Sequence, residues 1–184
     1  MKRLFVAIKV FPSEKLKKTM ALMRDTFKKE EINWVSPDNI HLTLLFIGSV
    51  AEQDVLLIQS ILRETEKKKS VAFTIEGLDT FGKKQKPEVI YARVTAGDEL
   101  QHLAFQIRTS LKDFVQAPEK RSFSPHITLG RIKKINPIEK FVSMVFDFRN
   151  AFFQDMECTE FVLFESVLTP TGPIYTTCEV FPLE

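Results

Sequence analysis

Apolar positions recur every three or four residues in four segments of the chain, which predicts four amphipathic helices. The first follows Ser13, which can cap a helix, and the last follows Asn136 and Pro137, expected to supply a cap and a first-turn proline. Elsewhere apolar residues alternate with polar ones or form short runs, which predicts strands. The expected helices are 14–27, 55–62, 98–115 and 138–146, and the expected strands are 3–10, 41–47, 71–75, 89–94, 126–130, 160–165 and 175–180.

Helices alternate with strands, but several strands follow one another without a helix between them. This order favours an α+β fold, with antiparallel or mixed sheets flanked by helices, over a doubly wound parallel sheet. The 184 residues include 44% hydrophobic residues and 17 Phe, enough for a substantial core. No long polar linker interrupts the chain, so we expect residues 1–184 to form a single domain of two closely packed lobes.

Charge and cysteine content restrict the function only weakly. The formal net charge of +2 is too small to indicate nucleic-acid binding, and the basic clusters at 83–86, 120–121 and 131–134 are most simply solvated loops. Cys158 and Cys178 lack the spacing of a metal site or disulfide framework, which favours free thiols in a cytoplasmic protein. Lys9 interrupts the first apolar run, so we interpret that run as a strand, and no apolar stretch is long enough to span a bilayer.

A short motif, His-x-Thr-Leu, occurs twice, beginning at His41 and at His126. The two copies contain two of the three histidines and lie 85 residues apart, close to half the chain length, as a duplicated structural unit would require. Alternate residues of a strand share a face, so each His shares a face with Thr43 or Thr128 while its apolar neighbours enter the core. Facing strands would therefore present two imidazoles and two hydroxyls across one cleft. The third histidine, His102, lies opposite the apolar face of its predicted helix and is expected at the surface.

Two histidines on one face can perform paired proton transfers near neutral pH. A neutral imidazole accepts a proton from the nucleophile while an imidazolium protonates the leaving oxygen, which suits in-line displacement at phosphorus. The hydroxyls of Thr43 and Thr128 can donate hydrogen bonds to phosphate oxygens, and Arg131 can add a charge-assisted contact. This chemistry requires neither a metal nor a cofactor.

Other interpretations of the same residues have less support. A single strand histidine is often only structural, but two identical frames favour a site of convergent titratable groups. A zinc site lacks nearby ligands, because neither motif carries a carboxylate and both cysteines are far away in sequence. A serine hydrolase would need a nucleophile elbow, which the sequence does not contain. Trp34 and Tyr91 are candidate platforms for stacking on a base, although an unplaced aromatic residue is more often part of the core.

The paired motifs resemble those of the two-histidine phosphoesterase superfamily, and in particular the RNA 2′,3′-cyclic phosphodiesterases, historically called 2′-5′ RNA ligases. The resemblance extends over the whole chain. It is carried by the segments 3–8, 39–48, 124–131, 163–166 and 172–175.

The resemblance implies a pseudo-symmetric two-lobed fold with one motif per lobe and the active site in a cleft between the lobes. It implies hydrolysis of RNA 2′,3′-cyclic phosphate ends to 2′-phosphates, with reversible 2′-5′ ligation as an associated activity. By the same resemblance His41 protonates the departing O3′, His126 accepts the proton of the attacking water, and Thr43 and Thr128 bind phosphate oxygens. The family often carries Pro-Arg and a tryptophan before the strand at Val89, whereas this chain has Lys86-Pro87-Glu88, so substrate contacts do not transfer there.

Two rival functions stay open. The cleft could hold a nucleotide or an RNA end without turning it over, although a pure binding site needs no pair of titratable groups. Alternatively the enzyme could act on a small cyclic nucleotide or on an ADP-ribose cyclic phosphate. The basic clusters favour RNA 3′ ends as the partner. No membrane association and no obligate protein partner are implied.

Overall fold

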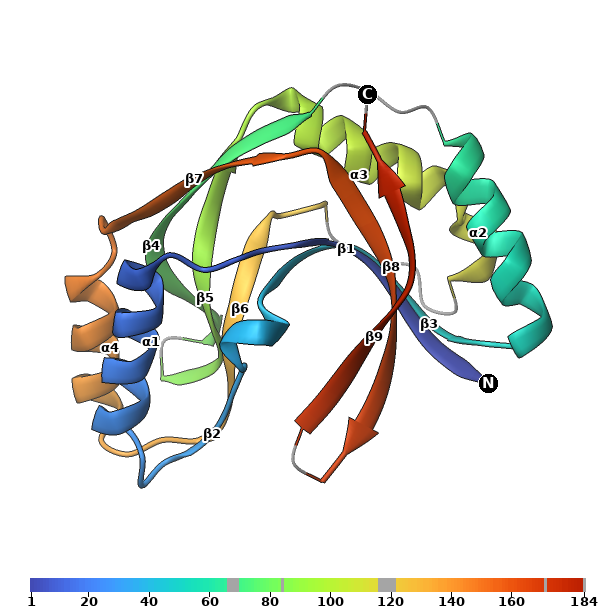
Figure 1. The fold of residues 1–184 in the computed structure, drawn as a ribbon. Helices are drawn as coiled ribbons and strands as arrows, with labels where there is room; N and C mark the ends of the chain where they lie inside the picture. Colours follow the sequence, from blue (N-terminus) through green and yellow to red (C-terminus); the bar gives the residue numbers. More distant parts are fainter. Residues whose placement is uncertain (66–69, 84, 116–121, 171, 184) are drawn as a thin grey trace.

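The computed structural model describes residues 1–65, 70–83, 85–115, 122–170 and 172–183, so Lys84, Lys120 and Arg121 of the predicted basic clusters lie outside the described residues. Within these ranges nine strands and four α-helices form an α+β fold, as predicted (Figure 1). The strands are β1 (Lys2–Lys9), β2 (Glu31–Trp34), β3 (His41–Val50), β4 (Val71–Lys83), β5 (Lys86–Ala96), β6 (His126–Lys134), β7 (Phe152–Cys158), β8 (Glu160–Thr169) and β9 (Gly172–Pro182). The helices are α1 (Glu14–Thr26), α2 (Val55–Glu64), α3 (Asp98–Ser110) and α4 (Ile138–Asp147), with 3₁₀ turns at Pro37–Asn39 (η1), Glu52–Asp54 and Lys112–Phe114.

The strands form one antiparallel sheet rather than separate sheets. Its order is β7-β4-β5-β6-β3-β1-β8-β9, with β2 paired to β6, and every pairing among the described residues is antiparallel. We name the two parts after their motifs: the His41 half (β3, β1, β8 and β9) and the His126 half (β6, β5, β4, β7 and β2). Between the halves, β3 pairs with β6 through Leu42 and Ile127. Matching strands outward from this pair, β1 corresponds to β5, β8 to β4 and β9 to β7, which is the pseudo-symmetry expected from a duplicated unit.

The helices cover one face of this sheet in two pairs (Figure 1). α2 and α3 contact each other; α2 contacts β9 of the His41 half, and α3 contacts β3 of the His41 half and β4 of the His126 half. α1 and α4 lie over the His126 half, where the rings of Phe27 and Phe141 meet with their centroids 5.3 Å apart. The apolar faces of all four helices therefore bury the same side of the sheet, and the other side is left for the polar residues of the strands.

Local signals explain the helix starts, with one correction. Ser13 caps α1 as predicted, because the Leu16 amide donates to Ser13 Oγ at 3.2 Å. The prediction for Asn136 as a cap was wrong: Pro137 is the cap residue and α4 begins at Ile138. The third helix was predicted to reach residue 115, but α3 ends at Ser110 and a 3₁₀ turn follows.

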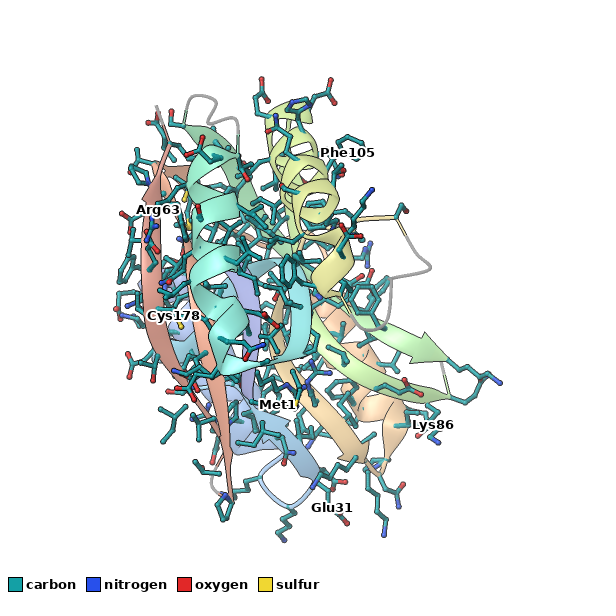
Figure 2. All side chains as sticks on the ribbon, turned by 90° about the vertical axis from the view of Figure 1, so that its right-hand side faces the viewer. Met1, Glu31, Arg63, Lys86, Phe105 and Cys178 are labelled. Carbon is teal, nitrogen blue, oxygen red and sulfur yellow. The ribbon has the colours of Figure 1, made fainter. Side chains whose placement is uncertain are left out.

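The strands extend further than the sequence pattern predicted. The strand predicted over 41–47 was expected to end before Gly48, yet β3 continues to Val50, and Gly48, at φ 98°, lies beside a shift in the pairing with β1. Such a φ is accessible to glycine without a Cβ clash, so the residue permits the irregularity instead of stopping the strand. Gly82 and Pro87 lie between the predicted strands 71–75 and 89–94, but both belong to the long β4–β5 hairpin, and Figure 2 shows Lys86 near its tip. The short strand β2 was missed altogether, and β7 was not among the predicted strands.

Two further predictions concern the exterior and the thiols. His102 is exposed on α3, as expected. Cys158 and Cys178 are free thiols. Among the described residues, no helix has both the length and the apolar character needed to cross a membrane.

Candidate active site

The pairing of β3 with β6, which joins the two halves of the sheet, places the two motifs side by side. Leu42 pairs with Ile127 in antiparallel orientation, so the adjacent positions set His41 opposite Thr128 and Thr43 opposite His126. Leu42 and Ile127 are 0% exposed in the core, whereas the two histidines and two threonines are half-buried on the other face. The residues that the sequence predicted to converge are therefore brought together by strand alternation and by one long-range pairing.

A β-bulge at the last residue of the motif in each half reverses the alternation of the strand. In β3, Thr43 pairs with Ala7 and Leu45 with Val6, which leaves Leu44 as the extra residue. Leu44 and Leu45 are consequently both buried, and Phe46 returns to the face that carries the motif.

The equivalent bulge in β6 positions Arg131. Here Thr128 pairs with Tyr91 and Gly130 with Ile90, so Leu129 is the extra residue. Leu129 and Gly130 are both buried, and Arg131 is exposed on the face of His126 and Thr128. Without the bulge, strict alternation would direct Arg131 toward the helices, so the sequence-predicted position of this cation depends on the irregularity.

Each imidazole is held by the backbone two residues before it. His41 Nδ1 lies 2.7 Å from the Asn39 carbonyl oxygen, and His126 Nδ1 lies 2.8 Å from the Ser124 carbonyl oxygen. A carbonyl only accepts hydrogen bonds, so Nδ1 carries the hydrogen in both rings. Nε2 is then the nitrogen free to accept or donate a proton at the open face.

Aromatic rings flank both histidines. The ring of His41 lies 5.0 Å from Phe5 and 5.2 Å from Tyr175, and the ring of His126 lies 4.8 Å from Phe81 and 5.4 Å from Tyr91, measured between centroids. Tyr91 was predicted as a stacking platform, and its ring lies against that of Phe81 at 4.1 Å.

Phe5, Phe81 and Tyr175 were not predicted as neighbours of the histidines. Alternation along the first strand places Phe5 on the same face as Lys9, so that pattern was a usable signal for Phe5. Phe81 and Tyr175 lie on strands whose register the sequence does not reveal.

The electrostatic environment of His41 favours its neutral form. Burial lowers the pKa of His41 below its ordinary value of 6.5; the hydrogen bond to Asn39 opposes this shift, and the positive charges of His126 and Arg131 add to it. The two imidazoles and the guanidinium are thus close enough to influence one another. Burial also raises the pKa of the Tyr175 and Tyr91 hydroxyls above 10.0, so both phenols stay protonated at neutral pH.

A cation lies directly across from each histidine on the outer neighbouring strand. Lys9 pairs with His41, and Arg93 pairs with His126. The guanidinium of Arg93 donates to the Arg149 carbonyl, whereas the Lys9 ammonium lies 5.1 Å from the centre of the Phe11 ring. These charges make the motif face attractive to an anion such as a phosphodiester.

Trp34 occupies the opposite face from the other predicted site residues. It pairs with Gly130 and packs against the core together with Ile32 and Ile90. A Cβ at Gly130 would lie 3.0 Å from the Trp34 ring, so the glycine makes room for the indole. The structure therefore brings His41, His126, Thr43, Thr128, Arg131 and Tyr91 to one face and places Trp34 on the other.

Cationic and titratable groups meet at this face, but a metal-binding set does not. Among the described residues, no group of three or more His, Cys, Asp or Glu side chains is arranged to hold a metal ion.

Comparison with known proteins identifies the family. The family described as LigT like Phosphoesterase matches this chain twice, over residues 10–91 and 94–175, and each match contains one His-x-Thr-Leu copy at almost the same distance from its start. An Archaeoglobus fulgidus protein named RNA 2′,3′-cyclic phosphodiesterase is 34% identical over 180 residues, covering 97% of this chain and 99% of the relative. A Thermotoga maritima protein of the same name is also 34% identical, covering 94% and 91%.

Solved structures agree with this grouping at the level of the fold. A crystal structure of a Thermus thermophilus protein aligns with a TM-score of 0.74 at 25% identity, covering 98% of this chain and 97% of that one. Escherichia coli LigT in its apo form also aligns with a TM-score of 0.74, at 21% identity and with coverage of 99% and 97%. The family matches both halves of this chain, and the two relatives align over nearly the full length of both proteins compared. The chain therefore belongs to the LigT-like phosphoesterase family, within the two-histidine phosphoesterases.

Proposed function

We propose that this protein hydrolyses the 2′,3′-cyclic phosphate at RNA 3′ ends to a 2′-phosphate, without a metal ion. The observation that carries the proposal is the convergence of two histidines and two threonines on one open face, with the two imidazoles held by equivalent backbone carbonyls. The names of the relatives supply the substrate class. Each half contributes one histidine, so residues 1–184 act as one domain.

The geometry supports an in-line displacement by two proton transfers. Nε2 of His126 takes a proton from water as the water oxygen attacks phosphorus, and the P–O3′ bond breaks as Nε2 of His41 protonates O3′. The Thr43 and Thr128 hydroxyls donate to the non-bridging oxygens, where negative charge accumulates, and Arg131 adds a cationic contact. At the end His126 is protonated and His41 is neutral, and exchange with solvent restores both.

The lowered pKa of His41 affects this assignment directly. In the free enzyme at neutral pH, His41 is mainly neutral and cannot act as an acid. A bound cyclic phosphate brings a negative charge to the imidazole, which favours the imidazolium and raises the pKa. We infer that the substrate itself converts His41 into the general acid.

The same arrangement can also join two RNA ends, and 2′-5′ cleavage is the reverse of that step. If an RNA 5′-hydroxyl takes the place of water and O3′ again serves as the leaving group, phosphorus stays bonded to the 2′-oxygen and the two ends are joined by a 2′-5′ bond. We propose this reversible ligation as a secondary activity of the same site. Free Cys158 and Cys178 support a reducing, cytoplasmic location for the enzyme.

An end-group assay tests the proposed function. The substrate is an oligonucleotide with a 2′,3′-cyclic phosphate, and the products are separated as 2′- or 3′-phosphates. We expect only the 2′-phosphate, undiminished by a chelator, and a loss of at least about 100-fold for His41→Ala and for His126→Ala. The matched control is His102→Ala, which removes an exposed histidine on α3 and should retain full activity. Full activity in either motif variant would contradict the acid and base roles.

A further inference from the structure

A small polar cavity adjoins His41 on the side of its own half of the sheet. Its volume is about 80 Å³. Its lining residues come from β1, from η1 together with the first residue of β3, and from the middle of β8 and of β9. Lys9 and Asp38 supply opposite charges to the lining, while Phe164 and Tyr175 supply aromatic surface. This volume holds several water molecules but cannot enclose a whole nucleotide, so any ligand of this cavity inserts only an edge.

The lining is built rigidly around the catalytic histidine. Asp38 lies in η1, whose next residue, Asn39, donates from its side chain to the Pro173 carbonyl at 3.1 Å and accepts from His41 through its own carbonyl. Tyr175 lies edge-on to Phe5, and Phe164 stacks on Phe5 at 5.2 Å. The backbone next to Asp38 and the aromatic wall are thus held relative to the imidazole, as recognition of a bound group requires.

The pairing of charges excludes a phosphate as the preferred occupant. A phosphate beside Lys9 would also lie beside the Asp38 carboxylate, and like charges repel. No salt bridge joins Asp38 to Lys9 within the described part of the chain, so both groups stay available to a ligand. A neutral group that offers donors to Asp38 and an acceptor to Lys9 satisfies both.

On this basis, and resting on the proposed function, we propose that the cavity binds the Watson–Crick edge of guanine in the nucleotide that carries the cyclic phosphate. The phosphate contacts His41, and its ribose joins it to its own base, so that base is the nearest one to the cavity. Guanine presents two adjacent donors, N1–H and N2–H, which a carboxylate accepts together, and an O6 acceptor for the Lys9 ammonium. Adenine, cytosine and uracil each lack the adjacent pair of donors on this edge.

The test uses four oligonucleotides that differ only in the terminal nucleotide, each ending in a 2′,3′-cyclic phosphate. For the wild-type protein we expect kcat/KM to be at least roughly tenfold higher with terminal guanosine, the discrimination typical of one bidentate contact. Asp38→Asn should abolish this preference by lowering only the guanosine value. If Asp38 acted only through its negative charge, Asp38→Asn would instead raise kcat/KM for all four substrates, because all of them are anionic. The matched control, Asp147→Asn, changes an exposed carboxylate at the end of α4 and should preserve the preference.

A binding measurement separates this inference from the proposed function. The affinities of 2′-GMP and 2′-AMP for the wild-type and Asp38→Asn proteins are measured by calorimetry, which needs no turnover. Tighter binding of 2′-GMP that disappears in Asp38→Asn supports the cavity assignment even if no cyclic phosphate is hydrolysed. Hydrolysis at equal rates for all four ends, a preference for another base, or a guanine preference that survives Asp38→Asn overturns it and leaves the proposed function intact.

Discussion

The proposal that substrate charge converts His41 into an acid can be tested with sulfate, an anion that mimics the phosphate and does not itself titrate near neutral pH. Sulfate binding to the motif face should raise the pKa of His41 from its lowered value. By linkage, protonated His41 binds sulfate more tightly than neutral His41. The affinity for sulfate should therefore be highest at low pH and should fall as the pH rises through the pKa of His41 in the free enzyme. Because that pKa is lowered, the fall should begin below pH 6.5.

The size of the effect follows from the surroundings of the ring. An anion about 4 Å from an imidazolium gains about 1 kcal/mol in water and about 4 kcal/mol at the effective dielectric constant of a partly buried site. His41 is half-buried, with only Nε2 available because Nδ1 is engaged by Asn39. We therefore take about 2 kcal/mol, which corresponds to a roughly 30-fold weakening of the sulfate Kd across the transition.

The assay combines NMR titration of the histidine rings with calorimetric sulfate binding at several pH values. The chain has three histidines, so single His→Gln variants assign every ring resonance. His41→Gln should remove the part of the pH dependence carried by this imidazole, and His102→Gln should leave the dependence unchanged. The reasoning is refuted if His41 in sulfate-free protein titrates at or above pH 6.5, or if its titration does not move when sulfate binds.

Two further predictions concern the hydroxyls and the joint between the halves. Thr43→Val and Thr128→Val each remove one donor to the phosphate oxygens while keeping the side-chain shape, so we expect kcat to fall by roughly 10- to 100-fold without unfolding; unchanged kinetics in both would exclude the phosphate-binding role. Leu42→Ala removes a fully buried side chain at the residue that pairs β3 with β6, and chemical denaturation should show a loss of about 2–5 kcal/mol in the free energy of unfolding. A loss below about 1 kcal/mol would mean that this residue does not hold the halves together.

The parts of the molecule that sequence reasoning predicted are those fixed by local periodicity. The helix faces, the cap at Ser13 and the two faces of each motif strand depend only on spacing of 3.6 or 2 residues. Gly48 shows the limit of such local rules, since a glycine can end a strand or permit a bulge, and the outcome depends on the neighbouring strand. β2 was missed for a related reason, because a four-residue strand carries too little alternation to distinguish it from a loop.

The composition of the site depended on long-range register, which no local pattern encodes. That His41 lies opposite Thr128, rather than opposite its own copy His126, follows from the pairing of Leu42 with Ile127. Trp34 was proposed beside the site because it precedes the motif strand in sequence. Its pairing with Gly130 places it on the core face instead.

The same pairings explain how a nearly symmetric fold can give the two histidines different roles. The motifs are equivalent in position and in backbone contacts, so the difference must come from the groups around them. At the first position on the motif face after the bulge, the His126 half carries Arg131 and the His41 half carries Phe46. Of the two histidines, only His41 adjoins the cavity that contains Asp38 and Lys9. The hydrogen bond of His126 to its backbone carbonyl is solvent-exposed, whereas that of His41 is partly buried. If the terminal nucleoside occupies the enclosed side, its O3′ departs beside His41 and water reaches phosphorus from the open side beside His126, which is the order of acid and base that the family resemblance implied.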